Sequence, residues 1–203
     1  SKKDFGVAFG GNGGFNGCGD LPDAGGTLEL PDSSSTVLAT QDLGLTAGST
    51  WIFRFSIVFS DYDTNSYFHA CLSNNDGNDS TSQNEMGCFW RNQSYGTANN
   101  FGVHNVEGAN PNSVNSTDQT TFSNNSTRKY YWEIIRQGAT SCKINFYGTD
   151  SSYTTVTSDS EDTSTNNVTD LNRIKFFSNA ATNTAGSVVI DDVYFCNNVI
   201  TPP

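Results

Sequence analysis

The sequence has little positive charge, with ten lysines and arginines against 21 aspartates and glutamates and a net charge of −11. This balance would repel a nucleic-acid backbone, and no basic cluster offsets it, so we expect no nucleic-acid partner. The acidic residues are mostly spread singly along the chain, which is typical of a surface that keeps a protein soluble.

Long apolar runs are also missing. No stretch of about 18 apolar residues could cross a bilayer, so we expect no membrane insertion. Segments with an apolar period of 3.6 residues are absent as well, and helices are therefore not expected. The chain starts at Ser1 without methionine or a signal peptide, and we interpret it as a mature or trimmed product.

Short aromatic and β-branched runs separated by polar loops are abundant, which is typical of β-strands. The clearest run is 51–59, where large apolar residues stand at every second position. Four more runs lie within 130–196, and shorter strands are expected at 36–45, 67–72, 86–91 and 101–106, with a polar loop at 110–127. The sequence predicts an all-β, antiparallel two-sheet sandwich over 28–198, followed by a tail at 199–203.

Residues 1–27 form a glycine-rich segment that contains nine of the 19 glycines. Within it Phe5, Val7 and Phe9 alternate with small residues, which is strand periodicity. We therefore expect an extended arm that pairs with a sheet edge, either of its own chain or of a neighbouring copy.

The five cysteines contain no CxxC pair, which argues against a zinc site or a thioredoxin motif. Disulfides are the default expectation and indicate an oxidising compartment. Cys71 with Cys88 and Cys18 with Cys196 are the candidate pairs, although sequence alone leaves the connectivity open. Cys142 stands on the apolar side of its run and is expected to be a buried free thiol.

Asn-x-Ser/Thr sequons occur six times, all in segments that we interpret as loops. Together with the cysteines they favour an extracellular or cell-surface glycoprotein, and the modified subset stays open. The candidate sites are Asn78, Asn92, Asn115, Asn124, Asn125 and Asn167.

Three segments resemble the concanavalin A-like lectin and laminin-G-like jelly-roll superfamily, and the similarity spans roughly residues 36–196. They are the hairpin YYWEIIRQGATSCKINFYGTD, the closing pair LNRIKFFSNAATNTAGSVVIDDVYF and the earlier hairpin CLSNNDGNDSTSQNEMGCFW. The resemblance implies a two-sheet jelly roll.

A rival resemblance is to galactose-binding-like carbohydrate modules, carried by NGGFN, VLATQDLGLTAGSTWIFRFSI and the closing Ile-Asp-Asp-Val. That family implies a structural calcium ion held by an acidic residue of the closing strand with N-terminal groups. Asn16 stands where those modules usually have glutamate. Both resemblances imply a two-sheet jelly roll.

A catalytic set is missing from the pattern. Glycosidases of the first superfamily carry Glu-x-Asp-x-(x)-Glu on one strand, and the retaining mechanism needs carboxylates about 5–5.5 Å apart. The five glutamates here are far apart in sequence, and His69 and His104 accompany no hydrolase motif. We therefore expect no enzyme.

Two groups of residues are candidate calcium ligands. Asp61, Asp63 and Asn65 present oxygens at alternate positions after a strand, although ordinary turn chemistry explains them equally well. Asp191 and Asp192 are adjacent, and strand alternation predicts that they point to opposite faces. At most one of them would then face inward, where it would need a cation or backbone donors.

A cluster of aromatic and amide residues is the candidate glycan site, because aromatic faces stack on sugars and amides bind hydroxyls. The alternative is that its large aromatics are ordinary core residues. The cluster comprises Trp90, Tyr95, Asn99, Asn100 and Phe101.

Two functions follow from these patterns. The first is a non-catalytic structural or adhesive glycoprotein that self-assembles through its arm into an extracellular filament, surface layer or matrix, as a homo-oligomer. The second is a carbohydrate-binding, lectin-like module.

Overall fold

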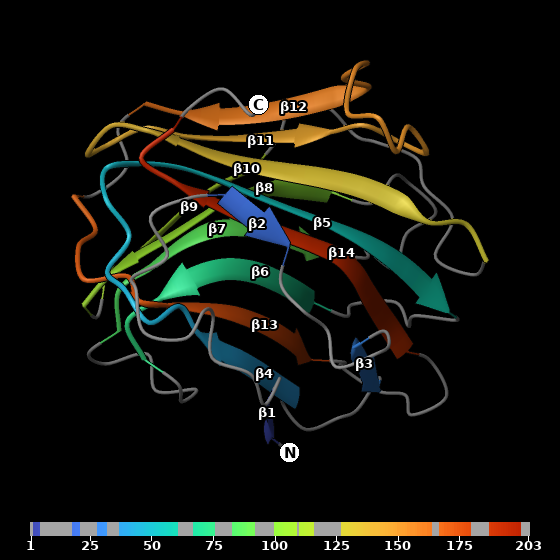
Figure 1. Ribbon diagram of the computed structural model, residues 1–203, viewed down its shortest axis with the longest axis horizontal. Coiled ribbons are helices and arrows are strands. Elements are labelled where there is room, and N and C mark those ends of the chain that lie inside the picture. Colours follow the sequence, from blue (N-terminus) through green and yellow to red (C-terminus); the bar gives the residue numbers. More distant parts are fainter. Residues whose placement is uncertain are drawn as a thin grey trace.

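The computed structural model of the chain is an all-strand structure, in which two sheets stack face to face (Figure 1). It describes residues 2–4, 18–20, 28–31, 37–60, 67–75, 83–91, 100–108, 110–115, 127–163, 167–179 and 187–199. This part of the chain contains no helix, as the sequence predicted, and so none long and apolar enough to cross a membrane.

Within the described residues, each sheet has seven strands. The first sheet runs in the order β1 (Lys2–Asp4), β4 (Val37–Asp42), β13 (Arg173–Asn179), β6 (Tyr67–Ser73), β7 (Glu85–Arg91), β8 (Asn100–Glu107) and β9 (Asn110–Asn115). The second runs β12 (Ser158–Asp162), β11 (Cys142–Phe146), β10 (Tyr130–Gln137), β5 (Thr50–Ser60), β14 (Ser187–Asn197) and β2 (Cys18–Asp20), with β3 (Leu28–Pro31) also on β14. The described pairs are antiparallel except for β1 with β4.

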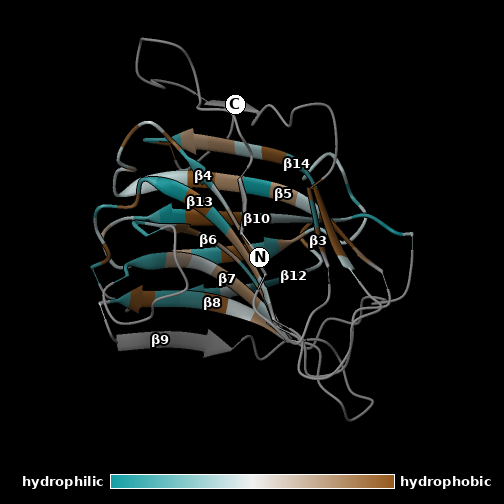
Figure 2. Cartoon of the chain, turned by 90° about the horizontal axis from the view of Figure 1, so that it is seen from below, coloured by the Kyte–Doolittle hydropathy of each residue, from teal (hydrophilic) through white to brown (hydrophobic). Residues whose placement is uncertain are grey.

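The core lies between the sheets and follows from strand alternation. On β5, Trp51, Phe53, Phe55 and Phe59 are fully buried toward the first sheet, whereas Arg54 points to the outer face. Hydrophobic and hydrophilic residues accordingly alternate along many of the strands (Figure 2). The predicted two-layer sandwich is confirmed, and its alternation gives each sheet an outer face that carries polar side chains.

Outside the arm, three described strands were not expected from the sequence: β3, β9 and β12. Strand β9 occupies part of the predicted loop at 110–127 and contains Pro111, which an edge strand tolerates because one side of its ladder needs no donor. Strand β12 reads SDSED and is also an edge strand. Strand β12 has no apolar alternation of its own, and it is recognised as a strand by its backbone pairing with β11.

The described parts of the N-terminal arm lie along the sandwich of the same chain. Strand β1 pairs with β4 and strand β2 pairs with β14. These pairings give no support to an arm donated to a neighbour. The predicted assembly residues lie outside the described ranges: Phe5, Val7 and Phe9.

The prediction of a disulfide between Cys71 and Cys88 is wrong, since both are buried free thiols. The register places Cys71 opposite Gly87 and Cys88 opposite Ala70, so the two side chains point to opposite faces of the sheet. Gly87 is needed there, because a Cβ at this position would lie 2.6 Å from that of Cys71.

The remaining cysteines follow their strands. Cys142 is a buried free thiol, as predicted. Cys196 is disulfide-bonded, and the register places Cys18 directly opposite it. Opposed residues of antiparallel strands have Cα atoms about 4.5–5.5 Å apart, within disulfide range. The Cys18–Cys196 disulfide stays a prediction, because the side chain of Cys18 is outside the description.

Candidate functional site

The predicted glycan cluster does not form a surface site. Trp90 and Phe101 are at most 1% exposed and point into the core, where Trp90 stacks on Phe59 at 4.2 Å and Phe101 meets Trp132 edge-on at 5.0 Å. The prediction is wrong for these two residues, because their inward positions on β7 and β8 bury them. The other members have no described side chain: Tyr95, Asn99 and Asn100.

The two adjacent aspartates of β14 lie on the same side of the sheet. The strand register shifts between Asp191 and Tyr194, and Asp192 has a left-handed φ of 50°. The Nζ atom of Lys129 is 2.6 Å from Asp191 Oδ2 and 3.0 Å from Asp192 Oδ2. The predicted opposite orientation is therefore wrong, because the bulge interrupts the alternation.

Lys129 is a cationic partner of both carboxylates, and a calcium ion at these two residues stays a prediction. Burial opposes the charged form of Lys129, but the hydrogen bonds to Asp191 and Asp192 outweigh it and raise its pKa to about 12. Within the described ranges no group of three or more His, Cys, Asp or Glu residues could hold a metal ion. The other predicted ligands lie outside these ranges: Asp61, Asp63 and Asn65.

Of the predicted sequons, Asn167 is exposed, and Asn115 is the last residue of strand β9 rather than part of a loop. The others lie outside the described residues: Asn78, Asn92, Asn124 and Asn125. Glycosylation stays a prediction.

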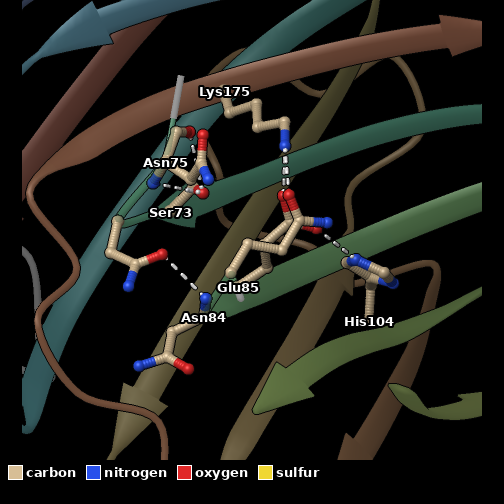
Figure 3. Close-up of polar contacts among 8 residues, drawn as sticks. Ser73, Asn75, Asn84, Glu85, His104 and Lys175 are labelled. Atoms are coloured by element: carbon tan, nitrogen blue, oxygen red, sulfur yellow. Dashed lines mark hydrogen bonds and ion pairs between the residues drawn. The ribbon is translucent and has the colours of Figure 1, made fainter. Parts of the chain in front are cut away.

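A buried charge cluster lies on the outer face of the first sheet (Figure 3). The Glu85 carboxylate accepts a hydrogen bond from His104 Nε2 at 2.8 Å and pairs with the Lys175 ammonium, which also donates to Gln83 Oε1 at 3.2 Å. The exposed fractions of Glu85, Lys175 and His104 are 4%, 2% and 7%. Burial would raise the pKa of Glu85, but His104 and Lys175 outweigh it and lower the value to about 2.

His69 belongs to the same cluster, with its ring 4.4 Å from that of His104. Burial, reinforced by the neighbouring His104, holds the pKa of His69 well below its ordinary value. The folded state therefore favours neutral His69, whereas the unfolded chain takes up a proton below about pH 6.5.

We expect the protein to lose stability as the pH falls from 7 to 5, because protonation of His69 in the unfolded chain favours unfolding. The contribution of His69 at pH 5 is at most about 2 kcal/mol. Urea unfolding at several pH values should show a shallower pH dependence for His69→Phe. Equal slopes for the two proteins would contradict this assignment.

The chemistry of the charge cluster is limited by the spacing of its carboxylates. Asp42 lies on the same face, in register with Arg173, Ser73 and Glu85 across successive strands. Asp42 and Glu85 are three strand spacings apart, which corresponds to about 14 Å. This separation is larger than the distance between the two carboxylates of a glycosidase. We interpret the cluster as a structural charge network.

A second polar site, which we call the tyrosine pocket, is a hollow of about 290 Å³ beside Arg54 and Tyr194, two residues that lie opposite each other on β5 and β14. Three half-buried tyrosines and two oppositely charged side chains surround it. Its lining residues are Arg54, Tyr131, Ser151, Tyr153, Asp192 and Tyr194.

Arg54 is fixed from two sides. Its Nε donates to Glu133 Oε2 at 2.7 Å, and its guanidinium carbon lies 4.4 Å from the centre of the Tyr153 ring. Tyr153 in turn meets Tyr131 edge-on at 5.7 Å. The carboxylate of Glu133 is buried, so the pair is held firmly.

Several polar groups of the pocket remain available to a ligand. The described hydrogen bonds of Arg54 use only Nε, and those of the Asp192 side chain use only Oδ2, from Ser56 Oγ and Lys129. The Tyr153 hydroxyl is buried and has no hydrogen-bond partner within the described part of the chain. The pocket thus offers guanidinium donors, a carboxylate acceptor and aromatic faces.

Sequence reasoning missed this site. Alternation along β5 does place Arg54 outward, and Glu133 lies within one of the strand runs expected in 130–196. Their contact joins positions 79 residues apart and depends on the register between β10 and β5, for which the sequence carries no signal. Tyr153 lies in a loop at φ 55°, a conformation that residue patterns did not indicate.

No protein-family model and no curated protein matches the sequence. Solved structures do match. A legume lectin-like domain from Entamoeba histolytica has a TM-score of 0.61 at 5% identity, covering 88% of this chain and 89% of that one. A β-glucanase from Bacillus licheniformis has a TM-score of 0.53 at 8% identity, covering 93% and 95%.

A xylan β-1,4-xylosidase from Bacillus halodurans C-125 matches with a TM-score of 0.53 and 9% identity. The match covers 84% of this chain and 32% of the xylosidase, so the chain spans about a third of that enzyme. At these identities the likeness concerns the fold. The chain has the concanavalin A-like jelly-roll fold, as the first of the two resemblances implied.

Proposed function

We propose that the protein is a non-catalytic, carbohydrate-binding module that holds a neutral sugar in the tyrosine pocket. The observation that carries this proposal is a hollow of about 290 Å³ in which tyrosine rings flank a guanidinium group and a carboxylate group, and each of these two groups engages only part of its hydrogen-bonding atoms. Ligand sites commonly combine apolar walls with a few well-placed polar groups. A sugar presents the matching surface, with apolar ring faces and hydroxyls that both donate and accept hydrogen bonds.

The charge balance favours a neutral ligand over an anionic one. Glu133 already compensates Arg54, and Lys129 is shared between Asp191 and Asp192. With three carboxylates against two cations around the pocket, an additional negative charge would be repelled. The net charge of the whole chain acts in the same direction.

The comparisons support the carbohydrate-binding alternative in general terms, because a lectin-like domain shares the fold over most of both chains. They give no support to a filament subunit, and neither do the described arm strands, which pair within the chain. The β-glucanase and xylan xylosidase among the matches suggest glucan and xylan fragments as first probes. We also propose that the protein is secreted, because the glycans proposed as its ligands are extracellular.

Asp192→Asn on a glycan array tests the proposal. Asparagine tolerates the left-handed backbone of this position but lacks the charge that strengthens a hydrogen bond from a sugar hydroxyl. We expect the wild-type protein to bind a defined set of glycans and Asp192→Asn to bind them about tenfold more weakly or worse.

Asp191→Asn is the matched control, because it removes a partner of the same lysine without lining the pocket. It should keep wild-type binding. No glycan binding by the wild-type protein, or equal losses for the two variants, would refute the tyrosine pocket as the site.

A further inference from the structure

A second hollow lies near the tyrosine pocket, beside the loop from Gly148 to Thr157. Its volume is about 540 Å³, and we call it the threonine hollow because four threonines line it. Its floor is aromatic, with Tyr130, Phe146 and Tyr147 among the lining residues. The lining threonines are Thr149, Thr154, Thr155 and Thr157.

The loop between the two hollows is held by its own hydrogen bonds. The Asp150 carboxylate accepts from the backbone nitrogens of Ser152, Thr154 and Thr155 at 2.9–3.0 Å and from the hydroxyls of Ser152 and Thr154. These hydrogen bonds, led by that of the Ser152 hydroxyl, keep the pKa of Asp150 below its ordinary value. The loop therefore forms a fixed ridge.

One contact between aromatic rings links the linings of the two hollows. Tyr147 lines the threonine hollow and Tyr153 lines the tyrosine pocket, with ring centres 5.1 Å apart. Glu133 supports both sides, because Oε2 accepts from Arg54 and Oε1 accepts from the Tyr147 hydroxyl at 2.8 Å. One buried carboxylate thus positions a lining residue of each hollow.

We infer that the ligand is an extended glycan of at least two linked sugar units, which crosses the ridge and places successive units in the two hollows. This inference rests on the proposed function of the tyrosine pocket. Thr155 and Thr157 line the second hollow, and their hydroxyls take no part in the hydrogen bonds to Asp150 that brace the loop. They are therefore available to the hydroxyls of the second sugar unit.

Calorimetric titration with two sugar ladders tests the inference: xylose to xylotetraose and glucose to cellotetraose. For the ladder that binds, we expect the affinity to rise about tenfold or more between the single sugar and the longer members. The double variant Thr155→Val, Thr157→Val keeps the side-chain shape but removes both hydroxyls. It should abolish this rise while leaving the binding of the single sugar unchanged.

The outcomes separate this inference from the proposed function. Binding that is independent of glycan length, or a double variant that retains the length dependence, would overturn the extended ligand and leave the tyrosine pocket standing. Failure of every member of both ladders and of the glycan array would overturn both. Thermal unfolding of the double variant should match that of the wild type and so exclude a folding defect.

Discussion

Replacing Lys175 by methionine is expected to lower the free energy of unfolding by about 3–5 kcal/mol at pH 7. Methionine has a similar length and retains the packing, so the loss comes from charge. Glu85 would stay 4% exposed with an ionised carboxylate, and its remaining partner in the cluster would be His104. Urea unfolding monitored by tryptophan fluorescence measures the effect.

The double variant Lys175→Met, Glu85→Gln is the control for this prediction. Because it removes both charges together, it should recover most of the lost stability. A single Lys175→Met variant that loses less than about 1 kcal/mol would contradict the view that the two charges depend on each other. A double variant that is no more stable than Lys175→Met would also contradict this view.

Tyr153→Ala is expected to weaken glycan binding by about 30-fold or more. Buried aromatic anchors at the centre of a binding site typically contribute about 2 kcal/mol or more when truncated. Tyr153 both lines the tyrosine pocket and carries Arg54 on its ring. Its loss would remove one wall of the pocket and leave the Arg54 guanidinium free to move. Titration calorimetry with the best glycan of the array measures the change in affinity.

Val156→Ala is the matched control on the same loop. Val156 is 45% exposed and lines neither hollow, so its truncation should leave affinity unchanged. Tyr153→Phe keeps the ring and removes the unpartnered hydroxyl, and an intermediate loss is expected. Wild-type affinity in Tyr153→Ala would place the ligand elsewhere on the sandwich.

The layers of the fold were predictable because the central strands alternate strongly. On β5 and β10 large apolar residues face inward at every second position, and this pattern alone defines a buried face. The edge strands β9 and β12 carry no such signal. Their polar residues are held in the sheets by backbone pairing to a neighbour, which depends on tertiary structure.

The candidate site was not predictable for a related reason. Trp90 and Phe101 were candidates for a surface glycan site, with burial in the core as the alternative, and their inward positions bury both. The pocket instead gathers residues from β5, β10, β14 and one loop, through a strand register and a bulge that residue patterns do not specify. Local patterns thus predict which face a residue occupies, but not which distant residues share that face with it.

The most direct test of the account is to map the ligand-binding surface by amide chemical shifts during titration with the best glycan of the array. We expect the largest shifts on residues 148–157, in the loop, and on residues 192–194 of strand β14 in the second sheet. Shifts concentrated on strands β6 and β7 of the first sheet, or no shifts at saturating glycan, would contradict it.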